Sequence, residues 1–184
     1  MNNKQKCHFF FKRINAFIFS FIFILILLPL LLILFIITLF DSHGRPIFVQ
    51  ERYGYKHKIF KIYKFRSLRE EKSSSWGRFM RYTSLDELPQ LFNILKGDMV
   101  FIGPRPLSIK ETDIDIARSN EEHSPYDVYP GLTGYAQIRF KYDDPILVKA
   151  KNDSYYVEHF SLFLDIKILI LTIVKFIPIR IHKK

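Results

Sequence analysis

The sequence predicts an α+β fold: a mostly helical, small membrane-associated domain with a short β-hairpin, an N-terminal re-entrant membrane helix and amphipathic interfacial helices. Three observations support this prediction. A long uncharged apolar run stands near the N-terminus, two short runs rich in β-branched and aromatic residues follow it, and apolar residues recur at helical spacing in the remainder. The chain has 184 residues, 48% of them hydrophobic, which provides for one modest core.

The apolar run covers residues 16–40, and its 25 residues include no charged side chain. A helix of about 20 apolar residues crosses a bilayer, so this run belongs in lipid. Pro29 stands near its middle and bends a helix there. Basic residues flank both ends, and the positive-inside rule places both flanks in the cytoplasm. We therefore expect residues 1–40 to form a basic flank and a re-entrant hairpin kinked at Pro29. A kinked single span is the alternative.

Residues 41–184 are expected to form one domain on the cytoplasmic face of the membrane. Within it, residues 46–50 and 58–65 are predicted to pair as a β-hairpin. The segment 160–184 is apolar but interrupted by charges, and its polar residues gather on one arc of a helix. It is predicted to be an amphipathic element on the membrane surface, with packing against the domain core as the alternative.

The middle of the domain is predicted to alternate helices with short connecting elements. Four apolar residues repeat at helical spacing, namely Leu88, Leu91, Phe92 and Leu95. This helix is expected to end at Gly97 and to place Asp86, Gln90 and Asn93 on the face opposite the apolar residues. Residues 99–102 form a short buried run, residues 108–127 a polar helix, and residues 130–134 a glycine-rich turn.

The charge balance favours an anionic partner. Lys and Arg number 28 against 18 Asp and Glu, a net charge of +10, which suits lipid headgroups, phosphorylated substrates or nucleic acid. No recognised nucleic-acid-binding module accompanies this charge, so nucleic acid is not expected as a partner. Cys7 is the only cysteine, which excludes an internal disulfide and a cysteine-based zinc site.

An acid pair, Asp86-Glu87, stands inside the stretch SLDELPQL. One interpretation is structural, because Ser84 and Glu87 have the spacing of a capping box and a helix start favours acids. Pro89 complicates this interpretation, since it would disturb the first helical turn, so we expect irregular local geometry. The other interpretation is chemical: adjacent helical side chains point about 100° apart, so the two carboxylates can serve two tasks.

Cationic and glycine-rich elements surround the acid pair in the sequence. They are Lys64, Arg66, Arg78, Arg81, Arg105 and the turn that contains Gly131, Thr133 and Gly134. A diphosphate-binding site needs such groups. A carboxylate nucleophile together with Mg²⁺ can displace a phosphoryl group in two steps through an acyl phosphate. Each basic residue, taken alone, is more often a solvated surface charge.

The residues from Thr83 to Leu107, TSLDELPQLFNILKGDMVFIGPRPL, closely resemble the signature of the bacterial sugar transferase family, the monotopic polyprenyl-phosphate phosphoglycosyl transferases. Three further blocks resemble that family in the same order: IFKIYKFRSL (59–68), PGLTGYAQI (130–138) and DSYYVEHFSLFLDIKIL (153–169). Together the blocks extend over nearly all of the chain after the membrane segment.

The resemblance implies a bacterial inner-membrane enzyme that transfers a sugar 1-phosphate from a UDP-sugar to polyprenyl (undecaprenyl) phosphate. It releases UMP and begins the assembly of a surface glycan. Asp86 corresponds to the nucleophile that takes a covalent phosphosugar, and Glu87 to its partner in the Mg²⁺ site. Arg81 and Arg105 fall on positions that meet phosphate or nucleotide, and Asp153 on an acid near the site; Lys64 is carried over as well. The family's membrane element is a re-entrant helix broken at a proline.

The chain also departs from the family pattern. The segment 69–82 is shorter than usual, Arg139-Phe140-Lys141 replaces a common motif, and Leu28 precedes Pro29 where a serine is usual. The sequence does not determine which sugar, which polyprenol or which glycan pathway is involved. It also leaves open whether the chain forms a homo-oligomer or has glycosyltransferase partners. The rival interpretation is a non-enzymatic basic adaptor at the membrane surface, in which the acid pair only caps a helix.

Overall fold

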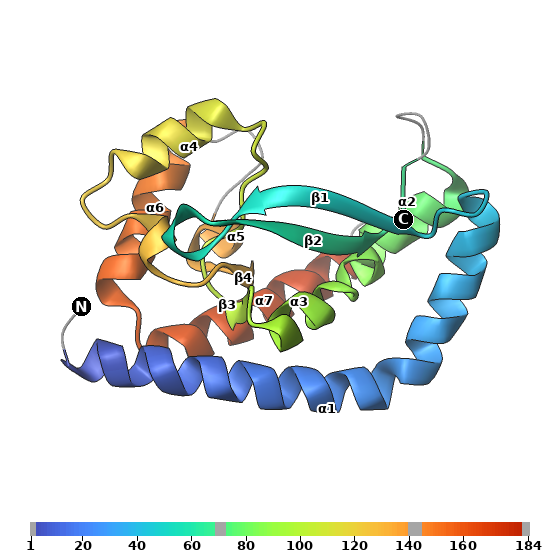
Figure 1. The fold of residues 1–184 in the computed structure, drawn as a ribbon, viewed down its shortest axis with the longest axis horizontal. Helices are drawn as coiled ribbons and strands as arrows, with labels where there is room; N and C mark the ends of the chain where they lie inside the picture. The colour runs from blue at the N-terminus through green and yellow to red at the C-terminus, as the bar shows by residue number, and fades with distance from the viewer. Residues whose placement is uncertain (1–2, 69–72, 140–144, 182–184) are drawn as a thin grey trace.

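The computed structural model describes residues 3–68, 73–139 and 145–181. It is a mostly helical α+β structure with a long N-terminal apolar helix and two small sheets, which agrees with the predicted class (Figure 1). The elements follow the order α1 (Asn3–Asp41), β1 (Ile47–Tyr53), η1 (Tyr55–His57), β2 (Ile59–Phe65), α2 (Ser75–Thr83), η2 (Leu85–Glu87), α3 (Gln90–Lys96), β3 (Val100–Ile102), α4 (Thr112–Ser119), η3 (Pro125–Asp127), β4 (Gly131–Thr133), α5 (Tyr135–Arg139), α6 (Ile146–His159) and α7 (Leu162–Ile181).

Helix α1 runs along one side of the molecule, changes direction sharply and ends beside α2 (Figure 1). Pro29 lies within it, and a proline removes one helical hydrogen bond and bends the axis. The helix is long and apolar enough to cross a membrane, and no other helix in the described part of the chain meets that test. This long, largely exposed apolar helix is consistent with membrane association.

Both ends of α1 contact the remainder of the domain. Near its start, the Lys12 ammonium lies 2.7 Å from an Asp165 carboxylate oxygen of α7. Near its end, the Trp76 indole N–H donates to the Thr38 hydroxyl at 3.0 Å. Between these points, Ile24 belongs to a cluster with residues of α3 and β3. The helix is therefore attached to one domain along its length.

The predicted hairpin is confirmed, because β1 and β2 pair antiparallel from Ile47 opposite Phe65 to Tyr53 opposite Ile59. The outer edge of β2 meets α3 through Asn93, which is fully buried. The Asn93 side chain accepts from the Tyr63 N–H at 3.0 Å and donates to the Lys61 carbonyl at 2.7 Å. This face of the helix is buried because the amide satisfies an open strand edge.

The predicted capping box was also wrong. Ser84 has a left-handed backbone (φ 57°, ψ 19°), closes α2 as its C-cap and makes no side-chain capping bond. The acids lie in the short 3₁₀ turn η2, and α3 begins only after Pro89. A proline at a helix start loses no bond there, so the chain ends one helix, turns and starts another. The irregular geometry expected around Pro89 is confirmed.

Residues 130–134 form no simple turn, contrary to prediction, because they contain strand β4, which runs parallel to β3. The Gly131 N–H donates to the Pro104 carbonyl at 2.9 Å, and the Gly103 N–H donates to the Thr133 carbonyl at 2.8 Å. A Cβ on Gly131 would lie 2.1 Å from the Gly103 nitrogen. Glycine is required there for the two backbones to approach. The helix expected over residues 108–127 is shorter than predicted and covers 112–119, with a 3₁₀ turn at 125–127.

Helix α7 packs against the domain with its polar side chains. Its polar arc faces the domain: Asp165 is buried, and Thr172 bonds to Thr133 of β4 at 2.8 Å. Its apolar side chains face outward, and Phe163 is 79% exposed. Contact of this apolar face with a membrane stays a prediction, and residues 182–184 lie outside the described residues.

Candidate active site

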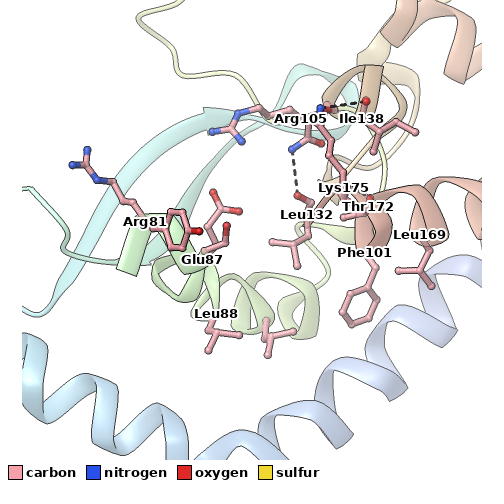
Figure 2. Close-up of a pocket in the computed structure, with 15 residues that line it drawn as sticks. Arg81, Glu87, Leu88, Phe101, Arg105, Leu132, Ile138, Leu169, Thr172 and Lys175 are labelled. Carbon is pink, nitrogen blue, oxygen red and sulfur yellow. Dashed lines mark hydrogen bonds between the residues drawn. The ribbon is translucent and has the colours of Figure 1, made fainter. Parts of the chain in front are cut away.

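A cavity of about 650 Å³ opens between the end of α2, the η2–α3 connection, β3, β4, α5 and α7. Figure 2 shows its lining side chains converging from these separate elements. Its polar lining includes Arg81, Glu87, Arg105 and Lys175. The Figure 2 view places Leu88, Phe101 and Leu169 on the side nearer α1. The cavity therefore has a charged part and an apolar part.

The contact of the apolar part with the membrane helix is direct. The Phe101 ring meets the Phe23 ring of α1 edge to face, with centroids 5.8 Å apart. Leu88 packs against the cluster that contains Leu31 and Leu34 of α1. We call Leu88, Leu91, Phe101 and Leu169 the cavity floor. It joins the cavity to the helix that carries the apolar run.

The acid pair occupies η2, between the left-handed end of α2 and the proline start of α3. Asp86 is only 8% exposed, and Glu87 is half-buried. Burial, and then the adjacent Glu87 charge, raise the pKa of Asp86 to about 6, against the opposing charges of Lys64 and Arg81. Glu87 lines the cavity, whereas Asp86 is not among the lining side chains.

Lys64 of β2 holds the second acid, with its ammonium 2.6 Å from a Glu87 carboxylate oxygen. A small adjoining hollow is lined by both of these residues together with Arg52, Arg105 and Gly131. The pKa of the Arg52 guanidinium is lowered, first by burial and then by the nearby Arg105 charge. Cations from β1, β2 and the loop after β3 therefore surround one face of the acid pair.

The structure brings together most, but not all, of the sequence-predicted site residues. Arg81, Arg105 and Thr133 line the main cavity with Glu87, while Lys64 and Gly131 line the adjoining hollow. Four others line neither space. Asp86 lies beside Glu87 in η2. Arg66 donates to the Arg45 carbonyl at 2.8 Å, and a Cβ on Gly134 would meet the Gly103 carbonyl oxygen at 2.1 Å. Asp153 is buried in α6.

Asp153 is 1% exposed and forms an ion pair with Arg118 of α4, itself 3% exposed. Arg118 also donates to the backbone carbonyl of Arg105 at 2.8 Å. Asp153 therefore supports the loop that carries Arg105 and does not itself reach the cavity. Two predicted features, the shortened segment 69–82 and Phe140-Lys141, fall in part or wholly outside the described residues.

Sequence reasoning missed two cations at these cavities, Arg52 and Lys175. Each comes from an element distant in sequence from the acid pair. Arg52 lies near the end of strand β1, and Lys175 lies in an apolar helix, where the sequence suggested only an interruption of the apolar run. No local pattern marks either residue.

The donor set at the acid pair fits a Mg²⁺ ion. No cluster of three or more His, Cys, Asp or Glu side chains occurs within residues 3–68, 73–139 and 145–181. Mg²⁺ at phosphoryl-transfer sites takes only one or two carboxylates, with substrate phosphates and water completing its ligands. Burial and then the Glu87 charge raise the pKa of Asp86, and a divalent cation would relieve the repulsion between the two carboxylates.

Comparison with known proteins identifies the family of this chain. Residues 7–178 match the family described as bacterial sugar transferase. The chain is 39% identical over 145 residues to the uncharacterized sugar transferase EpsL of Bacillus subtilis, with 72% of this chain and 70% of that protein covered.

Longer relatives carry specific names. The chain is 36% identical to the UDP-N-acetylgalactosamine-undecaprenyl-phosphate N-acetylgalactosaminephosphotransferase of Aeromonas hydrophila, covering 75% of this chain and 37% of that protein. It is 35% identical to the UDP-glucose:undecaprenyl-phosphate glucose-1-phosphate transferase of Escherichia coli K12, covering 73% and 33%. The chain thus spans about a third of the length of these two relatives. With the family matched over nearly its whole length, this chain belongs to the bacterial sugar transferase family.

Proposed function

We propose that this chain is a UDP-sugar:polyprenyl-phosphate sugar-1-phosphate transferase that performs the first membrane step of surface-glycan assembly. The names of its relatives support this reaction class. The observation that carries the proposal is the acid pair itself. The Glu87 carboxylate, with Asp86 next to it, stands between a group of cations and an apolar floor that contacts the membrane helix. A polar nucleotide sugar and a lipid phosphate can both reach such a place.

Asp86 is proposed as the nucleophile. Its carboxylate oxygen forms a bond to the β-phosphorus of the UDP-sugar while the bond from that phosphorus to the bridging oxygen breaks, and UMP leaves with the electron pair. An oxygen of polyprenyl phosphate then attacks the same phosphorus, and the Asp86 carboxylate leaves. The product is a polyprenyl diphosphate sugar. With a pKa of about 6, the Asp86 carboxyl is mostly ionised at pH 7.5, as a nucleophile must be.

The neighbouring charges bind and orient the phosphates. Arg81 and Arg105 line the cavity, and each presents the planar fork of donors that suits phosphate oxygens. Lys64 holds the Glu87 carboxylate in position beside Asp86. Mg²⁺ would be held by the Asp86 and Glu87 carboxylates with substrate oxygens, where it supplies positive charge that neutralises the transferred phosphoryl group.

Helix α1 is proposed to enter and leave the membrane on the same, cytoplasmic side of the bacterial inner membrane. A straight helix over residues 16–40 would separate its ends by about 37 Å. One small domain nevertheless contacts both ends, through Lys12–Asp165 and Thr38–Trp76. Two contacts to one domain support a re-entrant path over a span. Such a path brings the acid pair to the depth of lipid headgroups.

The test is intact mass spectrometry of the purified protein with Mg²⁺ and a panel of UDP-sugars. We expect one sugar to give a covalent phosphosugar adduct and UMP, and Asp86→Asn to lose both. Asp113→Asn is the matched control, because Asp113 is an exposed acid of α4 that lines neither cavity. Undiminished UMP release by Asp86→Asn would contradict the nucleophile assignment. No adduct and no UMP with any sugar would favour the non-enzymatic adaptor.

A further inference from the structure

The wall of the cavity opposite the acid pair is built by α7. Figure 2 shows Leu169, Thr172 and Lys175 across the cavity from Arg81 and Glu87. The outward side of α7 is apolar and exposed, so the same helix borders the cavity with one arc and presents hydrocarbon to its surroundings with the other. A group on the inner arc of α7 therefore lies close to any lipid that covers the outer arc.

Lys175 is the cation on this inner arc. Its ammonium donates to the carbonyls of Gln137 at 3.2 Å and Ile138 at 3.3 Å. These bonds are at or beyond the upper end of the usual N–H···O range, whereas an ammonium commonly meets a phosphate oxygen at about 2.7–2.9 Å. An ammonium therefore gains by exchanging a carbonyl oxygen for a phosphate oxygen.

The position of Lys175 is set by its neighbours on α7. The Thr172 hydroxyl donates to the Ile168 carbonyl at 2.8 Å and lies 2.8 Å from the Thr133 hydroxyl of β4. Ile168 is fully buried. These contacts pin the helix against β4, which fixes the direction in which the side chain three residues later leaves the helix. Lys175 is thus directed at the cavity by packing.

Two cationic regions then border one cavity, and they differ in what accompanies them. Lys64, Arg81 and Arg105 gather at the acid pair, which suits the diphosphate of a nucleotide sugar. Lys175 lies beside the cavity floor, whose Phe101 contacts α1. A nucleotide sugar is polar and does not require an apolar surface continuous with a membrane helix. A phosphate carried on an isoprenoid chain needs one cation and such a surface.

We propose that the α7 side of the cavity binds the acceptor, with Lys175 pairing with the phosphate of polyprenyl phosphate and the cavity floor holding its first isoprene units. This inference rests on the proposed function. The acceptor enters between α1 and α7, and its phosphate oxygen approaches the phosphorus held on Asp86 from the side opposite Arg81. Lys175 binds the acceptor and has no part in forming the adduct.

The experiment separates the two half-reactions in the full-length protein in detergent micelles. Adduct formation and UMP release are measured without acceptor, and adduct decay is measured after undecaprenyl phosphate is added. We expect Lys175→Met to form adduct within about twofold of wild type and to slow acceptor-dependent decay at least tenfold at low acceptor concentration. Lys175→Arg should recover part of the loss, and raising the acceptor concentration should recover most of it.

Lys167→Met is the matched control, because Lys167 is an exposed lysine of α7 that does not line the cavity. Its adduct decay should equal that of wild type. The proposal is overturned if the adduct of Lys175→Met decays at the wild-type rate after acceptor is added. It is equally overturned if Lys175→Met slows adduct formation or raises the KM for the UDP-sugar, because the cation would then serve the donor.

A binding measurement keeps this inference separate from the reaction. Native mass spectrometry with undecaprenyl phosphate and no UDP-sugar should show the lipid retained by wild type and Lys167→Met and at least tenfold less by Lys175→Met. Leu169→Gln should also reduce retention while leaving adduct formation unchanged. Wild type could form no adduct while Lys175→Met still retains less lipid than wild type. That result would reject the proposed reaction and support the acceptor site. Equal retention by all variants rejects the site.

Discussion

Two buried acids of this chain, Asp86 and Asp153, occupy opposite electrostatic situations. Asp86 is 8% exposed and Asp153 is 1% exposed. Burial raises the pKa of both. For Asp153 the next influence opposes burial, because the Arg118 guanidinium pairs with it. For Asp86 the next influence adds to burial, because Glu87 brings a second negative charge beside it.

The difference shows that burial of an acid does not by itself indicate chemistry. Asp153 has its charge balanced inside the protein and ties α6 to α4 and to the loop of Arg105. Asp86 is held beside a like charge at the edge of a cavity, which costs stability and is typical of functional sites. We therefore propose that Asp153 supports the fold and that Asp86 takes part in the reaction. The following predictions test that division, in order of decreasing effect.

Removing the balanced acid should cost the most. Asp153→Ala leaves the Arg118 guanidinium buried and unpaired, which should destabilise the fold by about 3–5 kcal/mol. Thermal unfolding in detergent should show Tm falling by about 10 °C. The double variant Arg118→Met with Asp153→Leu should recover most of the loss and still form adduct. A stable double variant without adduct would place Asp153 in the reaction itself.

Removing Asp86, the acid without a balancing charge, should instead increase the stability of the fold. For a carboxyl whose folded pKa of about 6 exceeds its unfolded value of 3.8, ionisation disfavours the folded state, so stability falls as pH rises through this interval. Asp86→Asn removes that penalty and should stabilise the fold by about 2 kcal/mol at pH 7.5 without divalent cation.

The check is the difference in Tm between Asp86→Asn and wild type in chelator, measured at several pH values. It should be about 5 °C at pH 7.5 and vanish at about pH 3, below both pKa values, where the wild-type acid is mostly protonated in both states. A difference that persists unchanged at about pH 3 would show that the gain has another origin.

Lys64→Met should give a smaller effect on the same acid pair. The substitution removes the cation that lies 2.6 Å from Glu87 and leaves two adjacent carboxylates less compensated. In chelator at pH 7.5 we expect a loss of about 1–2 kcal/mol, measured by thermal unfolding. Mg²⁺ should then raise the Tm of the variant more than that of wild type. Lys61→Met, an exposed lysine of the same strand, should behave as wild type. Equal Mg²⁺ responses would argue against a metal at the acid pair.

The smallest effect should come from removing the hydrogen bond between Thr172 of α7 and Thr133. Thr172→Val removes the hydrogen bond to Thr133 and should cost about 1 kcal/mol of stability. Because Thr172 fixes the helix that carries Lys175, acceptor-dependent adduct decay should slow about two- to threefold while adduct formation stays unchanged. Thr112→Val, outside both cavities, is the control. Slower adduct formation in Thr172→Val would show that α7 acts on the donor.

Several elements could be predicted from local pattern because their cause is local. The segments that form β1 and β2 are rich in β-branched and aromatic residues, which favour strands, and Gly97 ends α3 with the left-handed backbone expected of a C-cap glycine. The capping box failed because Ser84 and Glu87 have the right spacing in sequence but the chain reverses at Ser84. The turn at 130–134 failed because its glycines serve a close approach to Gly103, which only the fold reveals.

By itself, the sequence determined the apolar helix and its proline, the acid pair with its surrounding cations, and the family to which they belong. Those features follow from composition and from contiguous motifs. Only the tertiary structure decided which acid is balanced by Arg118, which cation faces the cavity from α7, and which apolar residues join that cavity to α1. The physical reason is that burial and charge compensation depend on partners far apart in the chain, such as Arg118 with Asp153 or Thr133 with Thr172, and no local pattern records those pairs.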